Sequence, residues 1–414
     1  MSELVDFGTI VLVVAGGLML ALLSTRLSVA LSVPGPAIFL VAAAVASDVF
    51  PKLGEQLSTK NVERIGTVAI VVILFDGGLS IGWRRFRVSA TPIFSLGLLG
   101  TFATAGVLAL FAHYALGLGW ITAGLLGAAI APTDPAVMFS VLGNREVGGR
   151  TGTILEGESG ANDPVGIALM IGMIDLATHA DSSFWIVVRE VALELSVGLA
   201  VGIAGGLVLA VVAQRIALPD EGLYLAGLLA GAGTIYGAAS VLHGSGFLAV
   251  FVAGILIGDM RLPFRRQMEM FQNGLSSLAE VVVFVALGLT IELGAIDVDT
   301  WADGLLLALF LAFVARPLVV APLLVPVRLR PGERLFVIWG GLRGAVPILL
   351  AAFALLEQVG EARRIYELVF VVVAFSVLVQ GASIPWVAER LGVPMRRIVS
   401  QEMDAAGRSD ERAA

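Results

Sequence analysis

The chain has 414 residues, of which 58% are hydrophobic and 14% are charged, and its mean hydropathy is +0.95. Because soluble globular chains carry about 25% charged residues, this composition indicates an integral membrane protein that lies in a lipid bilayer. The absence of cysteine excludes disulfides and thiolate metal sites, and three scattered histidines disfavour a zinc or haem protein. The net charge of −7 is small for this length and gives no indication of a nucleic-acid partner.

Apolar segments long enough to cross a hydrocarbon core of about 30 Å predict an all-α polytopic membrane protein with about 13 transmembrane helices. The expected spans are 7–23, 27–47, 62–80, 90–115, 119–142, 151–177, 184–214, 222–240, 245–259, 269–293, 300–326, 333–357 and 364–392. The first is expected to be retained rather than cleaved, because Glu3 and Asp6 precede it in place of a basic segment. Since the ninth span is short and the third and fifth contain charged residues, about 12 helices is the alternative count.

Basic residues are concentrated in alternate loops of this arrangement. One set of loops contains Arg26, Arg84, Arg85, Arg87, Arg145, Arg150, Arg215, Arg261, Arg265, Arg266, Arg328, Arg330 and Arg334. The other set contains acidic residues, among them Asp175, Asp181, Asp297 and Asp299. Because arginine-rich loops stay on the cytoplasmic side, we expect a protein of the cytoplasmic (inner) membrane with its N-terminus outside and its C-terminus in the cytosol.

An odd number of spans also suits an inverted repeat of six helices, one connecting helix and six more, a common build of secondary transporters. Two interrupted helices lie at matching places in the two halves. Residues 131–135 place two prolines in one turn of the fifth helix, and residues 340–347 combine three glycines, Arg343 and a proline in the twelfth. We therefore expect the two broken helices to cross near the membrane midplane and to form the binding site.

Residues 155–164 carry polar and ionisable side chains inside the sixth span. On a helix Glu156, Ser159 and Asp163 fall along one stripe, and Glu158 and Asn162 form a second stripe turned away from it. An ionised carboxylate near the bilayer centre costs about 2.5–3.5 kcal/mol or more, so it is retained only where it faces a protein interior, a cavity or an ion. Carboxylate, hydroxyl, amide and free carbonyl oxygens together indicate a site for a hard monovalent cation.

Asp163 and Asp134 are the strongest candidates for binding the ion. A buried carboxylate can exchange a proton for a metal ion, because burial favours its protonated form and a bound cation favours its ionised form. The alternative is a structural role, with Asp163 hydrogen-bonded in a helix break and Asp134 acting as a helix cap. Thr133 and Ser159 either supply further oxygen ligands or satisfy the backbone of their own helices.

Arg343 lies in the break of the twelfth helix and needs a partner within the membrane. We expect Glu158 to pair with it and to hold the two halves together, with direct ion contact by Arg343 as the alternative. Asp76, Glu280 and Arg316 are further intramembrane charges. They either form a second structural pair or line an access route, and both roles stay open.

No enzyme, cofactor or nucleotide site is expected. The sequence lacks a P-loop, a nucleophile elbow and a His-Glu-x-x-His zinc motif, and it has no GxGxxG following a strand. The ion site instead indicates secondary transport of a monovalent cation against H⁺. A cation channel and a membrane sensor that binds an ion without transporting it are the alternatives, and only an exchanger would move protons when a cation is added.

Several motifs together resemble the monovalent cation:proton antiporter-1 family, NhaP type. They are Glu158-Ser159 followed by Asn162-Asp163-Pro164, Thr133-Asp134-Pro135, and residues 341–347 (GLRGAVP), with 74–78 (LFDGG), 315–317 (ARP) and 378–381 (LVQG) in the expected order. The resemblance covers nearly the whole chain and implies one transporter domain, 1–414, that forms a homodimer. It implies a dimerisation part at 1–89 and 178–295, a mobile core at 90–177 and 296–392, and a short cytosolic tail at 393–414.

The same resemblance assigns roles to individual residues. It implies an ion site made of Asp163, Asp134, Ser159 and Thr133. It also implies a structural ion pair of Glu158 with Arg343, and it places Asn162 where electrogenic relatives have Asp, so we expect electroneutral exchange. The motifs look most like the branch of potassium/proton antiporters, whose members commonly carry a cytosolic regulatory extension that is not expected here. Na⁺, K⁺ and Li⁺ all stay open as ions exchanged for H⁺ in pH and cation homeostasis.

Overall fold

The computed structural model describes residues 33–50, 59–142, 145–179, 184–216, 219–260, 262 and 264–397, together with Gly16 and Met19. The span expected at 7–23, the first residues of the span at 27–47 and most of the expected tail at 393–414 lie outside these described residues. Within them the protein is helical apart from two strands of three residues each, so the all-α class is confirmed.

The helices before residue 180 are α2 (Gly35–Val49), α4 (Thr59–Phe94), α5 (Thr101–Leu116), α6 (Trp120–Ile130), α7 (Pro135–Leu142) and α8 (Gly149–Thr178). Those after it are α9 (Phe184–Arg215), α10 (Glu221–Val241), α11 (Gly246–Gly258), α12 (Arg265–Leu289), α13 (Val298–Phe310), α14 (Arg316–Leu324), α15 (Pro331–Trp339), α16 (Ala345–Leu356), α17 (Ala362–Phe375) and α18 (Ala382–Arg390). The π-helical turns η1 (Ser95–Gly100), η3 (Leu311–Ala315) and η4 (Ser376–Gly381) join consecutive helices, and η2 (Leu293–Ala295) is a short 3₁₀ turn. From 119–142 onward, each expected span corresponds to one helix or to two consecutive helices.

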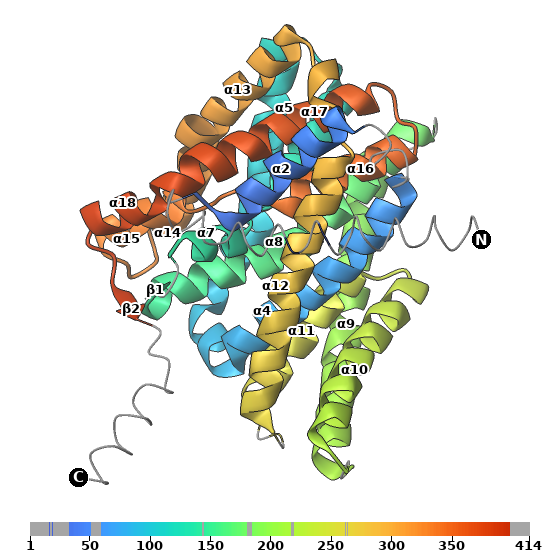
Figure 1. Cartoon of the computed structure of the whole chain (residues 1–414), viewed down its shortest axis with the longest axis vertical. Helices are drawn as coiled ribbons and strands as arrows, with labels where there is room; N and C mark the ends of the chain where they lie inside the picture. Colours follow the sequence, from blue (N-terminus) through green and yellow to red (C-terminus); the bar gives the residue numbers. More distant parts are fainter. Residues whose placement is uncertain are drawn as a thin grey trace.

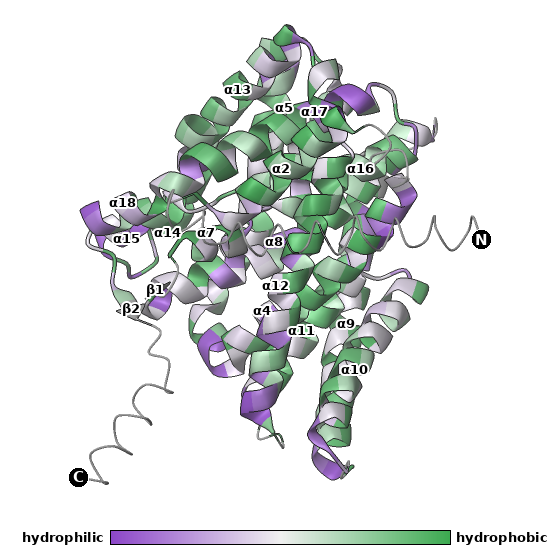
Figure 2. Ribbon diagram, in the orientation of Figure 1, coloured by the Kyte–Doolittle hydropathy of each residue, from purple (hydrophilic) through white to green (hydrophobic). Residues whose placement is uncertain are grey.

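Six helical stretches of the described chain are long and apolar enough to cross a membrane. They are Thr59–Leu116, Val187–Arg215, Glu221–Val241, Arg265–Leu289, Val298–Leu324 and Ala362–Arg390. Figure 2 shows that hydrophobic residues dominate their outer faces and that hydrophilic residues gather mainly near helix ends. Large apolar side chains such as Val208 and Leu318 are 62% and 60% exposed, as expected of a surface that faces lipid.

A bend in α4 separates two of the expected spans. Gly82 has a φ of 63°, a left-handed conformation that glycine adopts without steric cost. Beyond the bend, the backbone N–H of Arg84 donates to Asp259 Oδ2, which gives the start of the second part of α4 a capping partner. The expected spans 62–80 and 90–115 therefore appear as α4, η1 and α5 in sequence rather than as two separate helices.

Helix α8 lies at the centre of the molecule, with α5 and α13 on one side and α9 and α10 on the other (Figure 1). It contacts α4, α6, α9 and η1. Helix α4 also packs closely against α11, because a Cβ on Gly78 would overlap the α11 backbone and a Cβ on Gly254 would overlap that of α4. This packing surrounds the polar stretch of α8 with protein on several sides.

Both expected helix breaks are present. Helix α6 ends at Ile130 before α7 begins at Pro135, and α15 ends at Trp339 before α16 begins at Ala345. The two non-helical segments lie against each other, because the backbone N–H of Asp134 donates to the Leu342 carbonyl at 2.8 Å. Residues about 200 positions apart in the chain are thus brought together by backbone that has left its own helix.

An antiparallel pair of strands, β1 (Arg145–Val147) and β2 (Met395–Arg397), joins two distant parts of the chain. Val147 lies opposite Met395, and the Gly148 N–H donates to the Pro394 carbonyl at 2.8 Å. The pair connects the residues before α8 to those after α18. It was not predicted, because strands of three residues are too short to show a period of two.

Candidate ion-binding site

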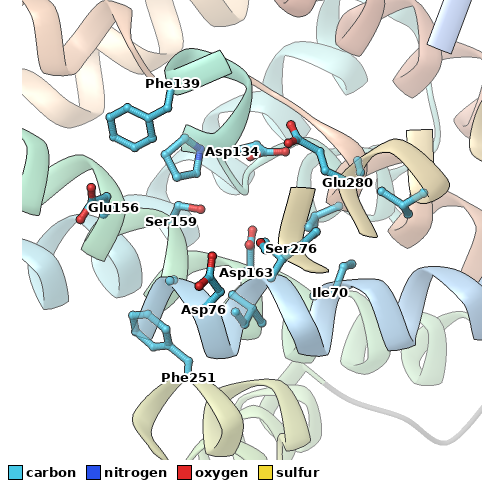
Figure 3. Close-up of a pocket in the computed structure, with 18 of the residues that line it drawn as sticks. Ile70, Asp76, Asp134, Phe139, Glu156, Ser159, Asp163, Phe251, Ser276 and Glu280 are labelled. Carbon is cyan, nitrogen blue, oxygen red and sulfur yellow. The ribbon is translucent and has the colours of Figure 1, made fainter. Parts of the chain in front are cut away.

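A cavity of about 190 Å³ lies beside the two helix breaks (Figure 3). Its polar and ionisable lining residues are Asp163, Ser159 and Glu156 of α8, Asp134 of the first break, Asp76 and Ser80 of α4, and Ser276 and Glu280 of α12. Apolar side chains, among them Ile70, Phe139 and Phe251, complete the wall. The fold therefore collects carboxylates from four separate segments around one cavity.

Helical spacing explains which α8 side chains reach this cavity. Glu156, Ser159 and Asp163 line it, as their common stripe indicates. Glu158 and Asn162 belong to the other stripe and form hydrogen bonds away from the cavity. Helix α8 runs unbroken through Pro164, so both stripes keep their helical register.

Asp163 is the most deeply buried acid of the cavity, with 6% of its surface exposed. Its Oδ1 has no hydrogen-bond partner among the described residues. A buried oxygen without a partner costs about 1–3 kcal/mol, and more for a charged group, so this carboxylate is stabilised by taking a proton or a cation. The sequence predicts that Asp163 binds the ion, and a buried carboxylate with one unpaired oxygen is suited to that role.

Asp134 enters the cavity from the first break and contacts the second one. A Cβ on Gly344 would overlap the Asp134 carboxylate, so the glycine leaves the space that this side chain occupies. The glycine was predicted as part of a helix break, but its contact with Asp134 was not. The position of the carboxylate thus depends on both broken helices.

Thr133 and Asn162 are buried beside the cavity but do not line it. The Thr133 N–H donates to Asn162 Oδ1 at 3.2 Å, and Asn162 Nδ2 donates to Thr133 Oγ1 at 2.8 Å. Asn162 therefore uses both amide atoms to satisfy polar groups of the first break. In this geometry the two side chains position the break, and direct ion contact by either remains a prediction.

The predicted pairing of Glu158 with Arg343 is wrong. Glu158 pairs with Arg316, whose Nη1 and Nη2 lie 2.7 and 3.1 Å from the two carboxylate oxygens. Both side chains are almost fully buried, and the two parallel hydrogen bonds satisfy both oxygens of the acid. The sequence contains two arginines in apolar surroundings, Arg316 and Arg343, and either could pair with Glu158. Only the position of Arg316 at the start of α14 shows which of them does.

The two arginines act on the two broken helices in matching ways. Arg316 also donates to the carbonyls of Ile338 and Val337, at 3.0 and 3.2 Å, in the last turn of α15. Arg343 Nε donates to the carbonyl of Ile130, the last residue of α6, at 2.9 Å. Each guanidinium therefore neutralises the partial negative charge at the end of one half-helix.

Asp76 and Glu280 line the cavity and do not pair with Arg316. Asp76 accepts a hydrogen bond from Ser276, and the Asn273 amide, turned so that both groups are satisfied, donates to its two oxygens at 2.9 and 3.3 Å. Glu280 lies one turn beyond Ser276 on α12, and its Oε1 has no hydrogen-bond partner in the described chain. Both acids therefore line the cavity, and their role in an access route remains a prediction.

The fold and the site define a polytopic α-helical membrane protein in which two broken helices meet at a cavity of buried carboxylates. Residues 11–390 match the protein family described as "Sodium/hydrogen exchanger, transmembrane". The chain therefore belongs to the sodium/hydrogen exchanger family, which confirms the family indicated by the sequence motifs.

Individual relatives carry names of both potassium and sodium antiporters. The K(+)/H(+) antiporter NhaP of Alkalimonas amylolytica is 34% identical over 343 residues, 82% of this chain and 59% of that protein. The K(+)/H(+) antiporter NhaP2 of Shewanella sp. (strain ANA-3) is 33% identical over 380 residues, 89% of this chain and 65% of that protein. This chain thus spans less than two thirds of the length of these relatives.

A solved structure shares the fold. The sodium proton antiporter MjNhaP1 from Methanocaldococcus jannaschii, determined at pH 8, superposes with a TM-score of 0.78 over 92% of this chain and 100% of that chain. At 22% sequence identity, this likeness concerns the fold alone.

Proposed function

We propose that this protein exchanges a monovalent cation, Na⁺, K⁺ or Li⁺, for H⁺ across the cytoplasmic membrane by alternating access. The observation that carries the proposal is the Asp163 carboxylate, which is buried in the cavity and has one oxygen unpaired within the described chain. Such a group is stabilised either by a proton or by a cation, and not by both at once. The relatives named above include antiporters of K⁺ and of Na⁺, so the proposal covers both ions.

We further propose that the exchange is electroneutral. Asn162, next to the carrier, cannot titrate, and its amide is already hydrogen-bonded to Thr133. If Asp134 keeps its ionisation state, Asp163 supplies one exchangeable negative charge. One proton then leaves for each monovalent cation that binds.

Two cavities support the proposal of alternating access, because they approach Asp163 from opposite ends of α8. The second, of about 630 Å³, is lined by Ile167 and Asp175 of α8, by His179 directly after α8 and by Thr67 of α4. On α8 the first cavity ends at Asp163 and the second begins at Ile167, one helical turn further along. One turn is about 5.4 Å, so a displacement of roughly this size would transfer the carboxylate from one cavity to the other.

The conformation described here is proposed to face the cytosol. Glu156 lines the cavity on the side that leads towards Arg84 and Arg150, which belong to the arginine-rich loops. The assignment of this side to the cytosol depends on the unequal distribution of arginine between the two sets of loops, which also favours an outer N-terminus and a cytosolic C-terminus.

We infer that the architecture is an inverted repeat of about 13 helices with the broken helices crossing near the midplane. The matching contacts at the ends of the two half-helices support this, since Arg343 reaches the end of α6 and Arg316 of α14 reaches the end of α15. By the same family resemblance we propose a homodimer, with a dimerisation part at 1–89 and 178–295 and a mobile core at 90–177 and 296–392.

The test is proton movement in proteoliposomes that contain a pH-sensitive dye. An inward gradient of Na⁺, K⁺ or Li⁺, compared side by side, should drive protons out of vesicles that contain the wild-type protein. Asp163→Asn should reduce this exchange to the rate of empty vesicles while leaving a folded protein, because it removes the titrating charge at nearly unchanged volume. Asp299→Asn, an exposed acid outside the cavity, is the matched control and should keep the wild-type rate.

The outcomes separate the alternatives. Cation flux without coupled proton movement would indicate a channel, and binding of a cation without any flux would indicate a sensor. Wild-type exchange by Asp163→Asn would refute the assignment of the carrier.

A further inference from the structure

A third cavity, of about 470 Å³, lies between the bend of α4 and the start of α8. We name it the arginine pocket and define it by Arg84, Arg85, Ser89, Arg150, Thr153 and Glu156. Among the described residues, three guanidinium groups and two hydroxyl groups therefore face one space, together with the acid Glu156. The pocket is on the face that the arginine distribution predicts to be cytosolic.

The arginines of the pocket have few partners of their own. Arg150 Nη2 donates to the Val88 carbonyl at 3.4 Å, a long contact, and its Nε is buried without any hydrogen-bond partner in the described chain. Among the described residues the side chains of Arg84 and Arg85 form no ion pair. A buried guanidinium nitrogen without an acceptor destabilises the protein unless another molecule supplies one.

These groups fit an anion with several oxygens. A planar guanidinium donates two parallel hydrogen bonds to phosphate, and the neighbouring hydroxyl of Ser89 can donate a further one. The Thr153 hydroxyl already donates to the Gly149 carbonyl at 3.4 Å. The N-cap of α8, Gly148, has no capping side chain, and the first turn of the helix contains no acid that would compete for its free N–H groups. These hydrogen-bond donors therefore favour phosphate, which has several acceptor oxygens, over an anion of a single atom.

We propose that the arginine pocket binds the phosphate of an anionic lipid headgroup. The residues beside the arginines on α4 are apolar and outward-facing, since Trp83, Val88 and Phe94 are 47%, 66% and 52% exposed. Trp83 also stacks on Phe86, with ring centroids 6.0 Å apart. Tryptophan and arginine side by side are typical of the level at which lipid headgroups lie, which gives the acyl chains an adjacent apolar surface. A soluble phosphate is the other source of the same chemistry.

The position of the pocket ties two segments together. Its ligand would bridge the bend of α4 and the first turns of α8, the helix that carries Asp163. Glu156 lines both the arginine pocket and the ion cavity, so the bound phosphate would lie at the entrance to the proposed ion route. Binding itself can be tested without any measurement of transport.

The experiment uses the full chain in nanodiscs and follows the melting temperature. In one arm, phosphatidylcholine discs contain increasing fractions of phosphatidylglycerol, and in the other, discs of pure phosphatidylcholine are titrated with inorganic phosphate. Four proteins are compared: the wild type, Arg150→Gln, the double variant Arg84→Gln/Arg85→Gln, and Arg87→Gln. Arg87 is exposed on the same segment and does not line the pocket, so it is the matched control for overall charge.

We expect phosphatidylglycerol to raise the wild-type melting temperature and inorganic phosphate to leave it unchanged. The half-saturating lipid fraction should rise about tenfold or more in the two pocket variants, the loss expected for a charge-assisted hydrogen bond, and by less than about twofold in Arg87→Gln. Because Arg84 and Arg85 are exposed, the double variant keeps the test valid even if Arg150→Gln fails to fold.

A response to inorganic phosphate that is lost in the pocket variants would support the pocket and identify the soluble source. Equal loss in Arg87→Gln would show that diffuse charge, and not the pocket, attracts the lipid. That result, or a wild-type protein that responds to neither ligand, would overturn the proposal.

Discussion

The buried pair of Glu158 and Arg316 makes a quantitative prediction about stability. Glu158→Gln preserves the size of the side chain but removes its charge. It leaves the guanidinium of Arg316 with uncharged acceptors, which are the Val337 and Ile338 carbonyls and the amide oxygen of the substituted side chain. Breaking a buried ion pair by removing one partner costs about 3–5 kcal/mol. Because the two carbonyl bonds survive, we expect the lower end of this range, about 3 kcal/mol.

A double-mutant cycle distinguishes Arg316 from Arg343 as the partner. Glu158→Gln and Arg316→Met should be less destabilising together than the sum of the two single changes, with a coupling free energy of about 2–3 kcal/mol. The cycle of Glu158→Gln with Arg343→Met should give about 1 kcal/mol or less, since no hydrogen bond joins that pair.

The assay is reversible unfolding of the purified protein in mixed detergent micelles, with the melting temperature as a second readout. Glu158→Gln alone should lower the melting temperature by about 3 °C or more. Arg343→Met is the matched control, because it removes an equally buried guanidinium, which lies in the break between α15 and α16. A larger coupling of Glu158 with Arg343 than with Arg316 would refute the assignment of the pair.

Three further predictions concern the site. Gly344→Ala should lower the exchange rate about tenfold or more, because its methyl group overlaps the Asp134 carboxylate, whereas Gly360→Ala, with open space around it, should exchange at the wild-type rate. Asn162→Ala should lower the free energy of unfolding by about 1–3 kcal/mol through the two lost hydrogen bonds to Thr133; unchanged stability in detergent would contradict the positioning role. Exchange should be bell-shaped in pH, because protons compete with the cation at low pH and become scarce for the return step at high pH. It should also be independent of a membrane potential clamped with valinomycin at constant K⁺, and turnover that follows the voltage would exclude a one-to-one exchange.

The sequence predicted those features that depend on local chemistry. Pro132, Pro135 and Pro347 interrupt helices by removing backbone donors, so the positions of both breaks follow from the order of the residues alone. The helical period likewise separated the stripe of Asp163, which faces the cavity, from the stripe of Glu158, which does not.

Features that depend on contacts between distant segments could not be predicted in this way. The choice of Arg316 over Arg343 as partner of Glu158 requires the relative placement of α14 and α8. The contact of Gly344 with Asp134 and the pairing of β1 with β2 likewise join residues more than 200 positions apart, and neither leaves a periodic signal in the sequence.

The two paired strands, β1 and β2, connect the start of α8 to the end of α18. The hydrogen bond from Gly148 to Pro394 breaks if the two strands separate by about 1 Å, so a movement of either helix end is transmitted to the other while the ladder stays intact. A force that pulls on the chain beyond Arg397 would act along β2 and be transmitted through its hydrogen bonds to β1. It would therefore reach the first turn of α8, the helix that contains Asp163. The segment that follows α18 is thus joined through a few hydrogen bonds to the helix that contains Asp163, some 230 residues away along the chain.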